Sequence, residues 1–271
     1  SGEKCILYIS PESLRSNTIF KLLMERRVER IVVDEAHCFS SWGHDFRVDY
    51  LYLAEFLRDL QTEKKLETPI PISCFTATAK KSVVEDICSY FKERLNIELV
   101  QFISPAKRSN LTYKVVESSE SQNERRKQLI NLLREYAGPK IIYASKVKTT
   151  ESLAEELYNR GFASACYNGK MESEKKMVIQ DQFQNEEVDT IVATTAFGMG
   201  VDKDNVELVA HYEISSTLEN YVQEAGRAGR NPNLQASCVA LFHPNDLNTS
   251  FQILQQSKLS AQEIATVWRV L

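Results

Sequence analysis

The 271-residue sequence lacks a long apolar run, a secretory signal and any internal repeat. A helix that crosses a bilayer needs about 20 consecutive apolar residues, and no stretch approaches that length. The first ten residues, SGEKCILYIS, have no basic segment followed by an apolar core, so they do not predict a signal peptide. No segment is of low complexity, and no fixed period recurs, which argues against repeat architectures. No membrane partner is expected.

Paired cysteines are lacking as well. The six cysteines are scattered at positions 5, 38, 74, 88, 166 and 238, with no CxxC pair and no histidine at zinc-finger spacing. Isolated cysteines of this kind are most often small buried side chains in a reducing compartment. We therefore predict no zinc site in this chain.

The composition is that of an ordinary globular protein, with 43% hydrophobic and 26% charged residues. The length predicts two compact units of roughly 100–150 residues each. A net charge of −4 argues mildly against a protein that coats nucleic acid by bulk electrostatics. It does not exclude binding of a nucleic acid along a narrow local track.

Short β-rich runs alternate with longer helical patterns, which predicts α/β units with parallel sheets flanked by helices. The predicted strands are 5–9, 30–34, 71–77, 113–117, 140–144, 164–167, 189–193, 208–212 and 236–242. The predicted helices are 48–60, 80–91, 124–136, 150–159, 173–183 and 218–226.

The pattern loosens over residues 98–118, and we place a domain junction there. The first part, residues 1–105, has too few strands for a complete sheet, so it is expected to be cut off at its start. Residues 106–247 carry enough strands and helices for a whole domain. Residues 248–271 begin a helical region, because Ser260 and Glu263 form a capping box.

Two adjacent acids end the predicted strand at 30–34. Asp34 and Glu35 come directly after Ile31-Val32-Val33, and ligands of open α/β sheets bind at such carboxyl ends. An aspartate there can hold Mg²⁺ through water, and a neighbouring glutamate can orient or deprotonate an attacking water. The alternative is an acidic strand end that only caps the following helix.

Aromatic side chains follow these acids without helical or strand periodicity. Trp42, His44 and Phe46 lie within five residues of one another, and Arg47 comes next. Bases of single-stranded DNA stack on such rings, each contributing about 1–3 kcal/mol, while an arginine can bind a phosphate. The alternative is a loop in which Trp42 only fills the core.

The run DEAHCFSSWGHDFRVDYLYL, residues 34–53, resembles motif II and the aromatic-rich loop of RecQ-family helicases of superfamily 2. This resemblance implies two RecA-like lobes, the first of them incomplete here. It also implies roles for single residues. Asp34 would contact Mg²⁺, Glu35 would be the catalytic base and His37 the coupling contact. The residues that would sense single-stranded DNA are Trp42, His44, Phe46 and Arg47.

Three further segments resemble motifs III, IV and V of the same family. They are CFTATA at 74–79, KIIYASK at 140–146 and VATTAFGMGVDK at 192–203. The resemblance implies that Thr76 and Thr78 link hydrolysis to lobe movement. In the last segment two glycines, Gly200 among them, allow the backbone to approach a phosphate closely. Thr195 would contact DNA and Asp202 the lobe interface, unless the segment is only a glycine-rich turn.

The run QEAGRAGR at 223–230 resembles motif VI. Its arginines lie three positions apart and can face one phosphate-sized target, where a guanidinium offsets transition-state charge. We assign Arg230 as the arginine finger and Arg227 as its partner, with Gln223 also catalytic. The alternative is a solvated basic helix end. The resemblance covers residues 5–247.

A phosphate-binding loop of the form GxxxxGK[ST] is lacking. The nearest match, Asn168-Gly169-Lys170-Met171, lacks the first glycine and has methionine where a hydroxyl should bind Mg²⁺. We therefore expect a piece of a longer protein that hydrolyses ATP negligibly by itself. The four-cysteine zinc module that follows many RecQ-like motors is also lacking, since only Cys238 lies beyond position 200.

The resemblance implies an ATP-dependent DNA helicase that moves 3′ to 5′ on single-stranded DNA and unwinds duplexes in DNA repair and recombination. Its cofactors would be ATP and Mg²⁺, and its partners single-stranded and tailed duplex DNA. We expect a monomer in the bacterial cytoplasm at the nucleoid, or in the nucleus of a eukaryote. Two alternatives stay open, namely a non-catalytic DNA-binding scaffold derived from a helicase and an RNA-directed helicase of the same superfamily.

Overall fold

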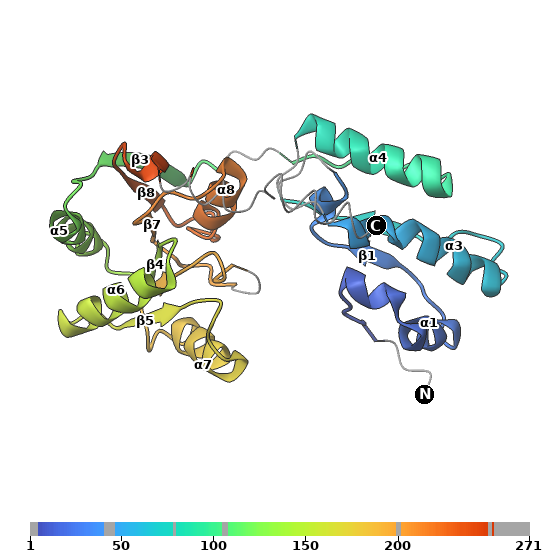
Figure 1. Ribbon diagram of the computed structural model, residues 1–271, viewed down its shortest axis with the longest axis horizontal. Coiled ribbons are helices and arrows are strands. Elements are labelled where there is room, and N and C mark those ends of the chain that lie inside the picture. The colour runs from blue at the N-terminus through green and yellow to red at the C-terminus, as the bar shows by residue number, and fades with distance from the viewer. Residues whose placement is uncertain are drawn as a thin grey trace, which may run out of the picture. The chain divides into compact units, whose positions relative to one another are not determined.

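The computed structural model shown in Figure 1 describes residues 5–40, 47–77, 80–104, 108–198, 202–248 and 251. The chain divides into two compact units, residues 1–105 and 106–271. In each unit, parallel strands are flanked by helices. The predicted α/β class is confirmed.

Unit 1 has two paired strands among its described residues. Strand β1 (Ile31–Val33) runs parallel to β2 (Ile72–Cys74), with Ile31 opposite Ile72. The other elements of unit 1 are η1 (Pro11–Arg15), α1 (Asn17–Met24), η2 (Ala36–Phe39), α2 (Val48–Leu51), α3 (Leu53–Glu63) and α4 (Lys81–Leu95).

The core of unit 1 lies where α3 and α4 meet η2. Leu57 and Leu60 of α3 are fully buried there, as is Phe91 of α4. The ring of Phe39 packs against Phe91 at 5.3 Å between centroids. Aromatic rings contribute more than their buried area when they meet edge to face. This packing fixes η2, the short helix that follows the two acids.

Two predictions for unit 1 were wrong, and one helix was not predicted. Residues 5–9 form no strand; their side chains are exposed, and the structure shows no strand beside them. A strand needs a partner for its backbone hydrogen bonds, which apolar composition alone does not supply. The helix expected at 48–60 is divided between α2 and α3 at Tyr52. Helix α1 was not predicted, although its apolar residues Ile19, Phe20 and Leu23 have helical spacing.

Unit 2 forms a six-stranded parallel sheet in the order β3-β8-β7-β4-β6-β5 within its described residues. Its elements are β3 (Leu111–Glu117), α5 (Gln122–Leu133), β4 (Lys140–Tyr143), α6 (Val147–Asn159), β5 (Ser164–Tyr167), α7 (Ser173–Gln184), β6 (Thr190–Ala193), β7 (Leu208–His211), α8 (Leu218–Ala225) and β8 (Ala236–Phe242). They match the predicted elements in kind and order, and strands β5 and β8 match in both bounds.

Helices cover both faces of this sheet. Along β4, Ile141 faces a core that includes Phe183 of α7, while Ile142 faces a core that includes Leu129 of α5. Every residue of the central strands β4, β6 and β7 is buried. Continuous apolar runs are typical of parallel strands covered on both faces. The carboxyl ends of these strands therefore share one edge, where ligands of such sheets bind.

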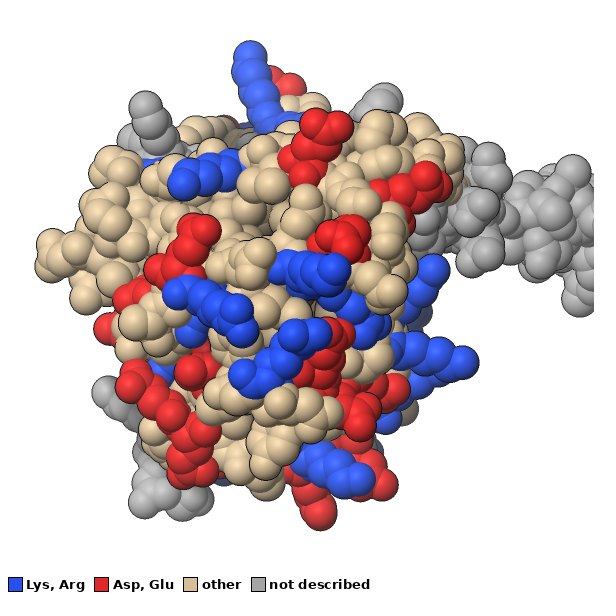
Figure 2. All heavy atoms as spheres, turned by 90° about the vertical axis from the view of Figure 1, so that its left-hand side faces the viewer, with Lys and Arg blue, Asp and Glu red and all other residues tan. Residues whose placement is uncertain are grey.

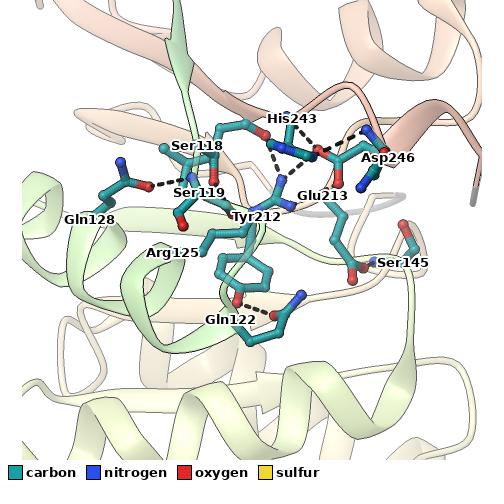
Figure 3. A network of polar contacts seen from close by, with 12 residues as sticks. Ser118, Ser119, Gln122, Arg125, Gln128, Ser145, Tyr212, Glu213, His243 and Asp246 are labelled. Atoms are coloured by element: carbon teal, nitrogen blue, oxygen red, sulfur yellow. Dashed lines mark hydrogen bonds and ion pairs between the residues drawn. The ribbon is translucent and has the colours of Figure 1, made fainter.

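A buried ion pair fastens the segment after β8 to the start of α5 (Figure 3). Both guanidinium nitrogens of Arg125 lie 2.8 Å from the carboxylate oxygens of Asp246. Arg125 also donates to the backbone oxygen of Leu241 at 2.7 Å. Its charged group lies 5.1 Å above the ring of Tyr212. The path of the chain beyond the sheet is thus held by a paired charge, as burial requires.

In the part of the chain that the structure describes, no helix has the length and apolar character needed to cross a bilayer.

Candidate functional site

The two acids sit at the carboxyl end of β1 in an unusual backbone turn. Glu35 is left-handed, with φ 50° and ψ 43°, a conformation uncommon outside glycine that tends to occur at functional sites. The nitrogen of Phe75 donates to Val33 at 2.8 Å, and Ala36 donates to Phe75 at 2.9 Å. These bonds fasten the turn to the end of β2. The Asp34 carboxylate accepts from the Glu35 nitrogen at 2.9 Å.

The structure brings Glu35, His37 and Thr76 together. Nδ1 of His37 lies 3.2 Å from Oε2 of Glu35 and 3.1 Å from Oγ1 of Thr76. His37 is only 4% exposed, so water competes little for these contacts. Oε2 of Glu35 is itself buried and makes no hydrogen bond of good geometry with the described residues. A carboxylate oxygen left in this state can accept a proton or hold a water molecule.

Tyr50 supports the acid turn from α2, and we did not predict this role from the sequence. Its hydroxyl donates to the backbone oxygen of Asp34 at 3.2 Å. Burial raises the pKa of Tyr50 to about 12, so the hydroxyl remains a donor over the working pH range. The only signal in the sequence was a tyrosine three residues after Arg47, on the helix that follows the aromatic segment.

Most of the predicted DNA-sensing segment lies outside the described residues, including Trp42, His44 and Phe46. Arg47 is described and half exposed, and its Nη2 lies 3.0 Å from Oε1 of Glu12. A phosphate that binds Arg47 would therefore compete with Glu12 for the guanidinium. Thr78, assigned beside Thr76, also lies outside the described residues.

In unit 2 the turn after β6 lies at the carboxyl edge of the parallel sheet, where ligands of such sheets bind. The nitrogen of Phe197 donates to the backbone oxygen of Thr194 at 3.0 Å, which closes the turn and leaves Thr195 exposed. A Cβ atom at Gly198 would lie 3.1 Å from Nη2 of Arg227. Glycine at this position therefore lets the guanidinium rest against the backbone. Gly200 lies outside the described residues.

The two arginines of the 223–230 segment have different surroundings. Arg227 is partly buried, and its Nε makes no hydrogen bond with the described residues. Arg230 is exposed, and its Nη1 lies 2.5 Å from Oδ1 of Asp202. Gln223 is half buried on α8. Within unit 2 the structure thus pairs Arg227 with Gly198, and Arg230 with Asp202.

Arg108 and Asn110 hold this arginine segment from the other side. Nη1 of Arg108 donates to the backbone oxygen of Gly226 at 2.9 Å, and its other nitrogen donates to Gly229. Nδ2 of Asn110, which is buried, donates to the same Gly229 oxygen at 2.8 Å. The sequence marked these residues only as part of a domain junction, because nothing local connects them to a loop more than 110 positions away.

Among the described residues, no group of three or more histidine, cysteine, aspartate or glutamate side chains could hold a metal ion. Asp34 offers an exposed carboxylate at the end of β1. A magnesium ion bound there would need water or phosphate oxygens for its other ligands. This is the usual way in which Mg²⁺ is held beside a nucleotide.

Basic and acidic side chains alternate on the face of unit 2 shown in Figure 2. Ion pairs are frequent among the described residues of unit 2, including Arg126 with Glu156 at 2.7 Å and Lys127 with Glu124 at 2.7 Å. Neighbouring charges of opposite sign cancel at a distance, so this face does not present the continuous positive track that a phosphate backbone requires.

Two family models match the chain. The DEAD/DEAH box helicase model matches residues 3–87, and the helicase conserved C-terminal domain model matches residues 124–232. Solved structures show the same fold. Helicase Lhr of Mycobacterium smegmatis aligns with a TM-score of 0.65 at 19% identity, covering 92% of this chain and 34% of that one. The class defined by the fold and by the acid and arginine segments is the superfamily 2 helicase core.

Curated relatives narrow the class. The chain is 37% identical to the probable ATP-dependent DNA helicase RecS of Bacillus subtilis over 98% of its length, and spans 51% of RecS. It is 37% identical to the ATP-dependent DNA helicase RecQ of Haemophilus influenzae over 91% of its length, and spans 38% of that protein. The chain belongs to the RecQ family, and it spans about half or less of these relatives.

Proposed function

We propose that this chain is part of the motor of an ATP-dependent DNA helicase. Residues 1–105 and 106–247 would be its two RecA-like lobes, and residues 248–271 the start of a C-terminal helical region. The single observation that carries the proposal is the cluster of Glu35, His37 and Thr76 beside Asp34. The cluster connects the acid pair at the end of β1 with Thr76, which follows β2. A connection of this kind is needed if ATP hydrolysis is to be coupled to movement.

The residues of unit 1 fit a nucleotide with its Mg²⁺. Asp34 is exposed and its carboxylate is oriented by the Glu35 nitrogen, so it can bind the ion through water. Glu35 is partly exposed beside Asp34, so its carboxylate can orient the attacking water and accept its proton. Mg²⁺ bound with ATP would neutralise charge on the phosphates. His37 contacts both Glu35 and Thr76, so a change at Glu35 during hydrolysis would be passed on to Thr76.

The residues of unit 2 supply positive charge. Arg230 is exposed and its partner Asp202 can release it to a phosphate, which supports its assignment as the finger. Arg227 is held against Gly198 and would act as its partner, with Gln223 on the same segment. A planar guanidinium binds phosphate oxygens in pairs and offsets charge in the transition state.

DNA would bind through the aromatic segment and through the turn after β6. Arg47 and the exposed Thr195 are the described candidates for phosphate contacts. Movement from 3′ to 5′, duplex unwinding, and roles in repair and recombination follow the RecQ resemblance. We propose further that the protein acts as a monomer where DNA is found, in a bacterial nucleoid or a nucleus, on single-stranded and tailed duplex DNA.

The test is ATP hydrolysis by the protein at its natural length, alone and with single-stranded DNA or RNA of the same length. The proposal expects stimulation by DNA and much less by RNA. Equal stimulation by RNA would favour an RNA-directed helicase. Hydrolysis that stays at background with and without DNA would refute the motor and favour a scaffold that only binds DNA.

A further inference from the structure

A buried polar cluster lies between β7 and α8, next to the arginine segment. His211, at the end of β7, is 0% exposed, and its Nε2 lies 2.9 Å from Oε2 of Glu224 on α8. Ser215 donates its hydroxyl to the same carboxylate oxygen. A carboxylate is rarely buried unless its charge is paired and hydrogen bonded. Here the carboxylate is hydrogen bonded by one side chain from a strand and one from a loop.

Aromatic rings enclose the imidazole of His211 on two sides. Tyr143 of β4 stacks on it with centroids 5.4 Å apart, and Tyr221 of α8 lies 4.8 Å away. The Tyr143 hydroxyl donates to the backbone oxygen of Phe197 at 2.8 Å. Burial raises the pKa of Tyr143, and the neighbouring guanidinium of Arg227 opposes that shift. One continuous set of contacts therefore joins β4, β7, α8 and the turn after β6.

The hydrogen bonds determine the proton on His211. Oε2 of Glu224 can only accept, so Nε2 must carry a hydrogen to bond with it. Nδ1 is buried and makes no hydrogen bond with the described residues. A bare nitrogen there leaves one acceptor unpaired, whereas a second N–H would leave a buried donor unpaired. The hydrogen bond to Glu224 therefore uses the hydrogen on Nε2 of His211.

Arg227 lies in the turn that follows α8, and its backbone nitrogen donates to the backbone oxygen of Glu224 at 3.2 Å, so the anchored residue and the arginine are directly linked. Ala225 and Ala228 between and beyond them are fully buried, which leaves little space for the segment to slide. A displacement of about 1 Å in a group that stabilises a transition state can cost about 100-fold in rate.

We infer that His211 and Glu224 are positioning residues of the proposed ATPase, which hold α8 so that Arg227 rests against Gly198. The inference rests on the proposed function. Neither residue touches the nucleotide; both act through the arginine segment. Anchoring by the pair is a property of unit 2 itself, and can be measured without turnover.

The test compares three variants of the natural-length protein. His211→Leu keeps a comparable buried volume and removes the hydrogen bond to Glu224. His211→Gln can still place an N–H near the carboxylate. Arg125→Met is the matched control, because it breaks a buried ion pair elsewhere in unit 2, at the start of α5. All three are expected to lower the melting temperature of the protein.

Steady-state ATP hydrolysis separates positioning from stability. His211→Leu is expected to lower kcat by about 10- to 100-fold with little change in the KM for ATP. His211→Gln is expected to keep most of the wild-type kcat. In an Arg227→Ala background the effect of His211→Leu should vanish, because both changes disable the same group. The effect of Arg125→Met should add to that of Arg227→Ala.

Hydrogen exchange of the amides of α8 gives a second readout that needs no ATP. It should quicken in His211→Leu and remain unchanged in Arg125→Met. The inference is overturned if kcat of His211→Leu stays within about twofold of wild type, or if its loss adds fully to that of Arg227→Ala. Unchanged exchange in α8 would also overturn it. An inactive wild type would refute the proposed function, while exchange in α8 would still decide whether the pair anchors the helix.

Discussion

The two units hold their functional residues by different means. In unit 2 the sheet is covered on both faces, and every residue of its three central strands is buried. In unit 1 two strands pair, and Val32 in the middle of β1 is 59% exposed. The acid turn of unit 1 is nevertheless well defined, because backbone bonds to Phe75 and the hydroxyl of Tyr50 hold it locally. Precise placement of a few side chains thus needs local contacts more than a wide sheet.

The exposed apolar side chains of unit 1 sharpen this contrast. Tyr8, Val100 and Phe102 are each more than three-quarters exposed. Parallel sheets are normally covered on both faces, and in the 271-residue chain the described part of unit 1 buries less of its apolar surface than unit 2 does. We therefore expect substitutions in unit 1 to affect chemistry before stability, and core substitutions in unit 2 to affect stability first.

The largest expected effect is on chemistry in unit 1. Glu35→Gln should reduce ATP hydrolysis of the natural-length protein by about 100- to 10,000-fold, the range for loss of a general base. The melting temperature should change little, since Glu35 is partly exposed. DNA-stimulated ATPase activity and thermal unfolding measure the two effects. Near-normal turnover in this variant would show that Glu35 is not the base.

A pair of truncations tests the difference in burial directly. Ile141→Ala, in the core of unit 2, should cost about 2–5 kcal/mol of unfolding free energy. Val32→Ala, measured in the 271-residue chain, in which Val32 is exposed, should cost less than about 0.5 kcal/mol, as is usual for surface positions. Chemical denaturation of both variants gives the values. Equal costs at the two positions would break the comparison between the units.

A smaller effect is expected for the contact between strands in unit 1. Thr76→Val removes the hydroxyl that lies 3.1 Å from His37, and should weaken the stimulation of ATPase activity by DNA about threefold to tenfold, the equivalent of one net hydrogen bond. Ser73→Ala is the control, since its hydroxyl accepts from Arg30 instead. The role of Thr76 is refuted if both variants retain full stimulation by DNA.

The smallest expected effect is a pH dependence of stability in unit 2. Burial alone would raise the pKa of Asp246, but hydrogen bonds from Arg125 and from the His243 backbone outweigh it and hold this pKa below its ordinary value. A carboxyl whose pKa is lower in the folded state stabilises the fold above its unfolded pKa of about 3.9. That stabilisation is lost as pH falls through the folded pKa.

Thermal unfolding of wild type and Asp246→Asn, between neutral pH and pH values below about 3.9, measures this contribution. The gap in stability between the two proteins should be widest at neutral pH and should narrow in acid. A gap that stays constant down to the lowest pH would mean that the ion pair of Asp246 does not lower its pKa.

The sequence predicted the strands and helices of unit 2 more completely than those of unit 1. Apolar runs such as 141–143 and 208–210 predicted its strands, because strands buried on both faces are rich in apolar side chains. In unit 1 the apolar run at residues 5–9 predicted a strand that the structure lacks. Composition selects residues that suit a strand, but only a neighbouring strand provides the hydrogen bonds.

For the candidate site, the sequence marked residues that stand close together in the chain and are rich in chemistry. The acid pair at 34–35 and the arginines at 227 and 230 were named for this reason, and their assigned roles stay predictions. The sequence did not indicate that Glu35 is left-handed, that Tyr50 supports the acid turn, or that Arg108 and Asn110 hold the arginine segment. Each of these depends on groups that meet only in the folded chain.

The sequence by itself therefore predicted the α/β class from its alternating patterns, and its motifs pointed to the RecQ family and to candidate site residues, because these features lie in short stretches of the chain. Only the tertiary structure decided which atoms meet. It placed His37 between Glu35 and Thr76, separated the surroundings of Arg227 and Arg230, and buried His211 against Glu224. Burial and pairing arise from contacts between distant positions, and such contacts leave no local pattern in a single sequence.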